Sequence, residues 1–129
     1  MEILMVLALI SIISVFCFPL YSQHIVYEKR VEAEITLNQI ATALEHYYLV
    51  NNTYQHATLS SLGFAGTTPD QRYQLEITNA TENQFQLRAN PINQQAKLDS
   101  ECAVLELNSE GEIKSYGTAT TETCWQRHT

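Results

Sequence analysis

The residue types that most often do chemistry are scattered in this chain and form no known catalytic pattern. His24, His46, His56 and His128 lack metal-ligand spacing, and neither a C-x-x-C nor an H-E-x-x-H motif occurs. No serine stands in a G-x-S-x-G motif, and no glycine-rich loop precedes a helical stretch. We therefore expect no enzyme activity, no metal site and no cofactor.

One carboxylate has an unusual position at the start of the sequence. Glu2 opens a run of apolar or small residues that extends from Ile3 to Leu20. As a helix this run would be about 27 Å long, close to the roughly 30 Å hydrocarbon thickness of a bilayer. A cleaved signal peptide is the alternative, but it would begin with basic residues and end in a small-residue cleavage site. Glu2 and the segment 18–21 replace these features, so we predict a retained membrane anchor.

The three cysteines are unevenly placed. Cys102 and Cys124 lie in a polar, strand-like region, whereas Cys17 lies in the apolar run and is expected to face lipid or pack against a helix. A bond between Cys102 and Cys124 would close a loop of about 23 residues and stabilise the fold by about 3 kcal/mol on the chain-entropy model. It would indicate an oxidising compartment, although secreted proteins also carry unpaired thiols.

The charge balance of the chain is acidic. Its net charge is −7, from 14 carboxylates and 7 basic residues. Between Asp99 and Glu122 there are six carboxylates and one base, Lys114. Such a surface repels nucleic acid and anionic lipid headgroups. The composition therefore disfavours polyanionic partners.

A single long helix is predicted for the first part of the chain. Between Pro19 and Gly63 there is neither glycine nor proline, and Asn51-Asn52 offers a helix stop. We expect a transmembrane half at 1–21, an amphipathic half at 22–50 and a kink at Pro19 where they meet. The apolar stripe of the amphipathic half comprises Ala33, Leu37, Ile40, Ala41, Leu44 and Tyr48, whereas Glu32, Glu34, Asn38, Gln39, Thr42 and Glu45 fall mainly elsewhere.

Beyond a loop, the periodicity changes to that of strands, and residues 51–129 are expected to form one globular unit. Two hairpins are predicted: strands at 72–78 and 85–89, then strands at 102–108 and 112–117 joined by Ser109-Glu110-Gly111. Pro91 is expected to end the second strand, because it cannot donate to a sheet. The apolar faces of both hairpins would cover the helical stripe, which gives an α+β fold. The residues expected to face the helix are Tyr73, Leu75, Ile77, Phe85, Leu87, Ala89, Ala103, Leu105 and Leu107.

These features together resemble the type IV pilins, and within them the PilE-like and minor-pilin branch with its ComP-like members. Glu2 and Pro19 have the separation of the glutamate and proline of the pilin helix, and HYYLVNNTY and LSSLG stand where such helices end. The resemblance covers nearly the whole chain. In its last part the family pattern is matched by Gln95, Asp99, Cys102, Leu105, Leu107, Gly111, Gly117, Cys124 and Trp125.

The resemblance implies a structural function for Glu2. In pilins this glutamate pairs with the methylated N-terminal amine of a neighbouring subunit as each subunit enters the filament, whereas from the sequence alone Glu2 could simply cap the helix among lipid headgroups. The implied partners are other pilin subunits, the inner membrane before assembly, the assembly machinery and the prepilin peptidase. Met1 stands where the family has the residue before the glutamate, so we expect a leader ending in glycine to be encoded upstream.

The predicted function is that of a subunit, and of a minor one, in a type IV pilus used for adhesion, twitching motility or competence. The localisation is then the inner membrane as a single-pass protein and the extracellular pilus. Two alternatives remain: a DNA-binding minor pilin for natural transformation, and a pseudopilin of a type II secretion system. DNA binding would need a basic stripe. The globular part offers only Arg72, Arg88, Lys97, Lys114 and Arg127.

Overall fold

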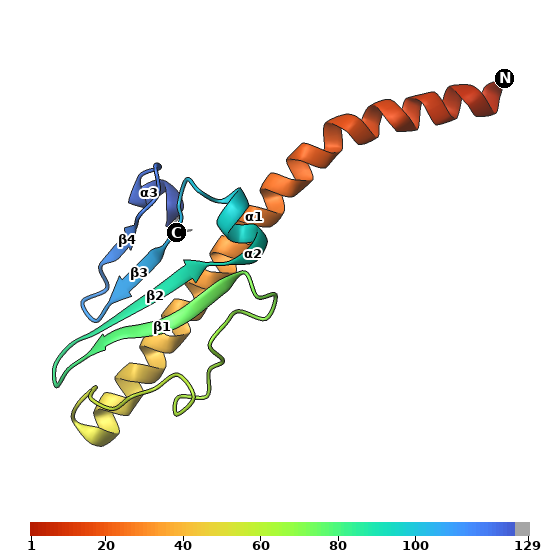
Figure 1. Cartoon of the computed structure of the whole chain (residues 1–129). Coiled ribbons are helices and arrows are strands. Elements are labelled where there is room, and N and C mark those ends of the chain that lie inside the picture. The colour runs from red at the N-terminus through yellow and green to blue at the C-terminus, as the bar shows by residue number, and fades with distance from the viewer. Residues whose placement is uncertain (126–129) are drawn as a thin grey trace.

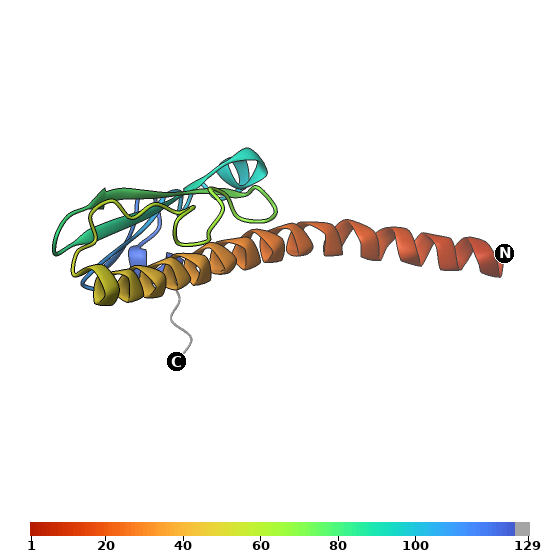
Figure 2. The same ribbon diagram turned by 90° about the horizontal axis from the view of Figure 1, so that it is seen from below.

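The computed structural model describes residues 1–125, apart from the side chains of residues 17–20. One helix, α1 (Glu2–Asn51), runs along the molecule, and the described residues that follow it lie over its second half. Figures 1 and 2 show the sheet as a layer on one side of this helix, whose first half projects beyond the globular part. The predicted α+β fold is confirmed.

The helix ends where the sequence predicts. The last helical residue is Asn51, and Asn52 adopts the left-handed conformation, with its amide donating to the carbonyl of Tyr48 at 2.7 Å. Asparagine tolerates this conformation, which reverses the chain direction after a helix. The following loop then returns along the sheet and pairs with it through the bridge between Thr67 and Gln74.

The sheet is an antiparallel meander with strand order β1-β2-β3-β4. Neighbouring strands are consecutive in the chain, so short turns make every connection except the one between β2 and β3. That connection contains the short helix α2. The elements after α1 are β1 (Tyr73–Ala80), β2 (Phe85–Pro91), α2 (Asn93–Leu98), β3 (Leu105–Asn108), β4 (Ile113–Ser115) and α3 (Thr121–Cys124).

The third and fourth strands are shorter than predicted. Strand β3 begins at Leu105 rather than Cys102, because Ala103 has a φ of 51° and its amide donates to the carbonyl of Asp99. This turn takes Cys102 and Ala103 out of the sheet. Helices α2 and α3 were not predicted, since each is too short to produce a recognisable period.

The core lies between the apolar stripe of α1 and the facing side of the sheet. Ala33, Leu37, Ile40 and Leu44 are at most 1% exposed, and Ala41 and Tyr48 are half-buried against them. Alternate residues of the strands complete the cluster, as the period of two predicts. The buried strand residues are Tyr73, Leu75, Phe85, Leu87, Ala89, Leu105 and Leu107.

Aromatic side chains join the end of α1 to the first hairpin. Tyr54 stacks on Tyr48 with a centroid distance of 4.8 Å and meets Phe85 edge-on at 5.0 Å. The Tyr54 amide donates to the carbonyl of Thr81 in the turn between β1 and β2. Such aromatic pairs contribute about 0.5–1.5 kcal/mol each beyond their burial. The tyrosines near the helix end therefore pack against the core and hold the end of α1 to the first hairpin.

Replacing Leu37 with alanine tests the central contact between helix and sheet. Because Leu37 is fully buried, we expect Leu37→Ala to lower the free energy of unfolding by about 2–5 kcal/mol. The fluorescence of the buried Trp125 reports unfolding of the globular part of the full chain in detergent micelles. Gln39→Ala, at an exposed position of the same helix, should leave stability nearly unchanged. Equal effects of the two variants would contradict the assignment of the core.

Candidate functional site

The first half of α1 presents an apolar surface all round the helix. Every residue from Glu2 to Phe16 is exposed, and Figure 1 shows this half projecting away from the sheet. An apolar surface of this extent is unfavourable in water and indicates contact with lipid or other protein. Its large exposed residues are Ile3, Leu4, Met5, Val6, Leu7, Leu9, Ile10, Ile12, Ile13, Val15 and Phe16.

The polar side chains of this half are few. Ser11 and Ser14 donate to the carbonyls of Leu7 and Ile10, each at 2.8 Å, and so satisfy their hydroxyls within the helix. Glu2 is the one charged side chain of residues 2–16, and it lies in the first helical turn. A negative charge is favourable there because it opposes the positive end of the helix dipole. The tip of the apolar helix thus carries a single anionic group.

Between the two halves of the helix the axis changes direction. Residues 2–16 and 21–51 lie at 40° to each other. Among the described residues no single helix has the length and apolar composition of a membrane span, but this bent pair taken together does. Pro19, predicted to cause the kink, is one of the residues whose side chains lie outside the described part of the chain. Its role stays a prediction.

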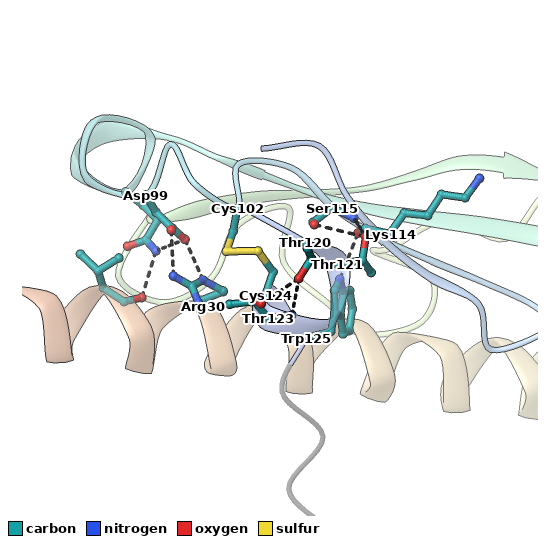
Figure 3. The surroundings of a disulfide bond; sticks show 12 residues. Arg30, Asp99, Cys102, Lys114, Ser115, Thr120, Thr121, Thr123, Cys124 and Trp125 are labelled. Carbon is teal, nitrogen blue, oxygen red and sulfur yellow. Dashed lines mark hydrogen bonds and ion pairs between the residues drawn. A yellow bond between two sulfur atoms is a disulfide. The ribbon is translucent and has the colours of Figure 1, made fainter. Parts of the chain in front are cut away.

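Where α1 meets the globular part, charged and polar groups fix α2 to the helix. Arg30 donates from Nε and Nη2 to the two carboxylate oxygens of Asp99, at 2.9 and 2.8 Å (Figure 3). Gln95 of α2 donates to the Val26 carbonyl at 3.1 Å, and the Tyr73 hydroxyl donates to Asp99. We call Arg30, Tyr73, Gln95 and Asp99 the joint. A two-bond pair of this kind fixes orientation as well as distance.

The joint was not predicted, although two of its members stood in the quoted family pattern. Gln95 and Asp99 are 0% and 3% exposed, so they serve the packing of α2 rather than a surface function. Arg30 could have been found from its spacing, because it precedes Ala33 and Leu37 by three and seven residues on the buried face of the helix. Burial opposes the charge of Arg30, but the hydrogen bonds to Asp99 and the charge of Asp99, with smaller contributions from Tyr73 and Glu34, together outweigh this effect and raise the pKa of Arg30.

Glu34 corrects the predicted polar face of α1. The sequence placed it away from the apolar stripe, but it is only 7% exposed. Its Oε1 atom has no hydrogen-bond partner among the described residues. Burial raises the pKa of Glu34 to about 7, against the opposing charge of Arg30 and with a further contribution from Asp99. Glu34 is therefore buried beside the joint, where Asp99 follows α2, and the buried face of α1 is wider than its six apolar residues.

The C-terminal segment is held by the disulfide between Cys102 and Cys124, which the structure contains (Figure 3). Both cysteines are buried, and α3 places the second one. Trp125 follows directly and donates from Nε1 to the Lys114 carbonyl at 3.0 Å. Gly117 lies so close to this segment that a Cβ would stand 2.0 Å from the Glu101 carbonyl oxygen. Only glycine allows this approach.

Two of the five basic residues that the globular part offers for DNA binding are engaged within the protein. Arg88 pairs with Glu106 on the outer face of the sheet, and Arg72 donates to the side-chain amide oxygens of two glutamines. Lys97 and Lys114 are exposed, whereas Arg127 lies outside the described residues. On α1, Lys29 pairs with Asp70 and Glu32. The described surface therefore carries no continuous basic stripe of unpaired side chains.

The predicted site residues do not form one site. Glu2 lies in the first turn of α1, whose first half projects from the globular part (Figure 1), whereas the disulfide joins Cys102 to Cys124 within the globular part. Among residues 1–125 without 17–20, no cluster of His, Cys, Asp and Glu could hold a metal ion. The arrangement is that of an apolar tail joined to a folded head, which defines the type IV pilin class.

Comparison with known families specifies this class further. Residues 19–106 match the family described as the type IV minor pilin ComP, a DNA uptake sequence receptor. The chain belongs to this family. No curated protein sequence matches the chain.

Two solved structures are similar to the chain. The non-core minor pilin PilV of Neisseria meningitidis is 23% identical with a TM-score of 0.58, over 73% of this chain and 89% of its own. A type IV pilin from Shewanella oneidensis is 26% identical with a TM-score of 0.49, over 68% of this chain and 89% of its own. The likeness to PilV supports the fold, namely one long helix under an antiparallel sheet.

Breaking the disulfide tests its contribution to the C-terminal segment. We expect Cys102→Ser to lower the free energy of unfolding by about 3 kcal/mol, because the bond restricts the unfolded chain over 22 positions. The fluorescence of Trp125, next to Cys124, provides the measurement. Cys17→Ser is the matched control and should have little effect on the globular part. An unchanged unfolding midpoint for Cys102→Ser would contradict a structural role of the bond.

Proposed function

We propose that the chain is a minor pilin that enters a type IV pilus through the first half of α1. The observation that carries this proposal is the exposed apolar helix with one carboxylate at its tip. Before assembly, lipid of the inner membrane covers this helix, with the chain as a single-pass protein divided at 1–21, 22–50 and 51–129. In the filament, the equivalent helices of other subunits replace the lipid.

Glu2 acts in this proposal as the group that sets the position of each subunit. An uncompensated carboxylate in lipid costs several kcal/mol, so a nearby positive charge attracts it strongly. By the family resemblance, that charge is the methylated amine of a neighbouring subunit, freed by the prepilin peptidase. Pro19 provides the bend that lets the apolar half follow the filament axis while the head stays outside. The filament functions that follow are adhesion, twitching motility and competence.

Replacing Glu2 tests this mechanism. We expect Glu2→Gln to lower the amount of the protein in sheared pili by about tenfold or more, since a neutral side chain loses the attraction that guides docking. The measurement is an immunoblot of sheared pili and of membranes from cells that express the chain from its own gene, upstream sequence included. Glu28→Gln, an exposed carboxylate on the same helix, is the control. Normal incorporation of Glu2→Gln, with an unchanged membrane pool, would contradict the proposal.

DNA reception during natural transformation is the second candidate function. The match of residues 19–106 to a family described as a DNA uptake sequence receptor favours it. The net charge of −7 and the paired states of Lys29, Arg30 and Arg88 oppose it. If this chain is a receptor, recognition must rely on contacts to base edges more than on phosphate neutralisation.

The family match is to a pilus component, which disfavours a pseudopilin of a type II secretion system.

A DNA-binding assay separates the two candidates. On charge grounds we expect the full chain in neutral detergent micelles not to retard a random-sequence duplex at micromolar protein concentration. The same protein is then incubated with fragments of its own genome, and the retained fragments are sequenced. Enrichment of one recurring sequence, weakened by Lys97→Ala or Lys114→Ala, would support the receptor. Strong binding to random duplex would contradict the charge argument.

A further inference from the structure

A second carboxylate, Glu34, lies beside the joint between α1 and α2, where Arg30 is the one positive charge acting on it and Asp99 already uses that charge. Arg30 directs two of its donors to Asp99, and Glu34 lies one helical turn further along α1. Glu34 is buried at 7% exposure, and its Oε1 atom has no partner among the described residues. A buried carboxylate in this state is costly when ionised and acceptable when protonated.

The surroundings of Glu34 are defined by groups from three elements. The charged groups that act on it are Arg30 of its own helix and Asp99 at the end of α2. Tyr73 of β1 directs its hydroxyl to Asp99, and burial raises the pKa of this phenol, so that it stays neutral. Gln95 donates to Asp99 at 3.3 Å and carries no charge. One guanidinium therefore faces two carboxylates.

We propose that Glu34 makes the joint sensitive to protons: neutral Glu34 leaves Arg30 to Asp99, and ionised Glu34 competes for the same guanidinium. When Arg30 is shared, the contact that holds α2 on α1 weakens. The joint borders a groove between α1 and the segment after α2, which is lined in part by Val26, Arg30, Leu98 and Asp99. The groove lies where the helix leaves the head, so the seating of the head on the helix becomes dependent on pH.

The direction in which pH changes stability follows from the protonation of Glu34 in the folded and in the unfolded chain. In the unfolded chain Glu34 has its ordinary pKa of 4.5, whereas in the folded chain burial raises the pKa to about 7. Between these values the folded state binds the proton and the unfolded state does not. Stability therefore falls as the pH rises through this window, and the loss is complete above about pH 7. Glu34→Gln, which is neutral at every pH, should remove this contribution.

The experiment compares the full chain in detergent micelles with Glu34→Gln between pH 4.5 and pH 8. Relative to the variant, the unfolding equilibrium of the natural chain should shift toward the unfolded state by on the order of a hundredfold over this range. Trp125 fluorescence follows unfolding, and hydrogen exchange of the Asp99 amide, which donates to the Gln95 carbonyl, follows the joint itself. Amide exchange becomes faster at high pH in any protein. In the natural chain we expect exchange of the Asp99 amide at pH 8 to be faster than this intrinsic effect explains. In Glu34→Gln we expect the intrinsic effect alone.

Two further arms make the outcome decisive. Glu110→Gln removes an exposed carboxylate in the turn after β3 and should keep the pH profile of the natural chain. If Glu34→Gln does not fold, the carboxyl carbon of Glu34 is titrated by NMR in the natural chain; a midpoint near 7 supports the proposal and one below 5 overturns it. Parallel profiles of the natural chain and Glu34→Gln would also overturn it.

Discussion

The fold depends on the burial of one apolar stripe of α1 beneath a four-stranded sheet. Leu37, Ile40 and Leu44 are almost fully removed from solvent, and each buried side chain of this kind contributes about 1.5–3 kcal/mol. The same helix continues beyond the sheet with apolar residues on every side. Its two halves therefore need two different surroundings, one supplied by the chain itself and the other by lipid or further subunits.

The polar groups near the middle of the helix decide how the head is oriented on it. Burial of apolar side chains is not directional, so it holds the sheet against the helix without fixing their angle. The bond pair from Arg30 to Asp99 and the hydrogen bond from Gln95 to the Val26 carbonyl supply that direction. At the other end of the contact, Tyr54 connects the helix terminus to the first hairpin. The head is thus fixed at two separate points along α1.

Much of this architecture could be predicted because periodicity and breakers are local properties of the sequence. The stripe of α1, its end at Asn51-Asn52 and the inward residues of β1 and β2 all follow from spacing alone. The joint could not be predicted in the same way. Arg30 and Asp99 are 69 positions apart, and only the packed structure shows that they meet. Glu34 was misplaced because a carboxylate was assumed to be solvated, whereas it is buried near Arg30 and Asp99. The start of β3 was wrong because the left-handed turn at Ala103 carries no glycine to announce it.

The disulfide and the joint share one short segment of chain, from Asp99 to Cys102. At one end this segment is bound to the helix through Arg30, and at the other it is covalently attached to Cys124 near the chain terminus. A tensile load applied along the helix of a filament subunit therefore passes through Asp99 directly to a covalent crosslink. The head is therefore held to its helix at this end by an ion pair that a covalent bond supports three residues further along the chain.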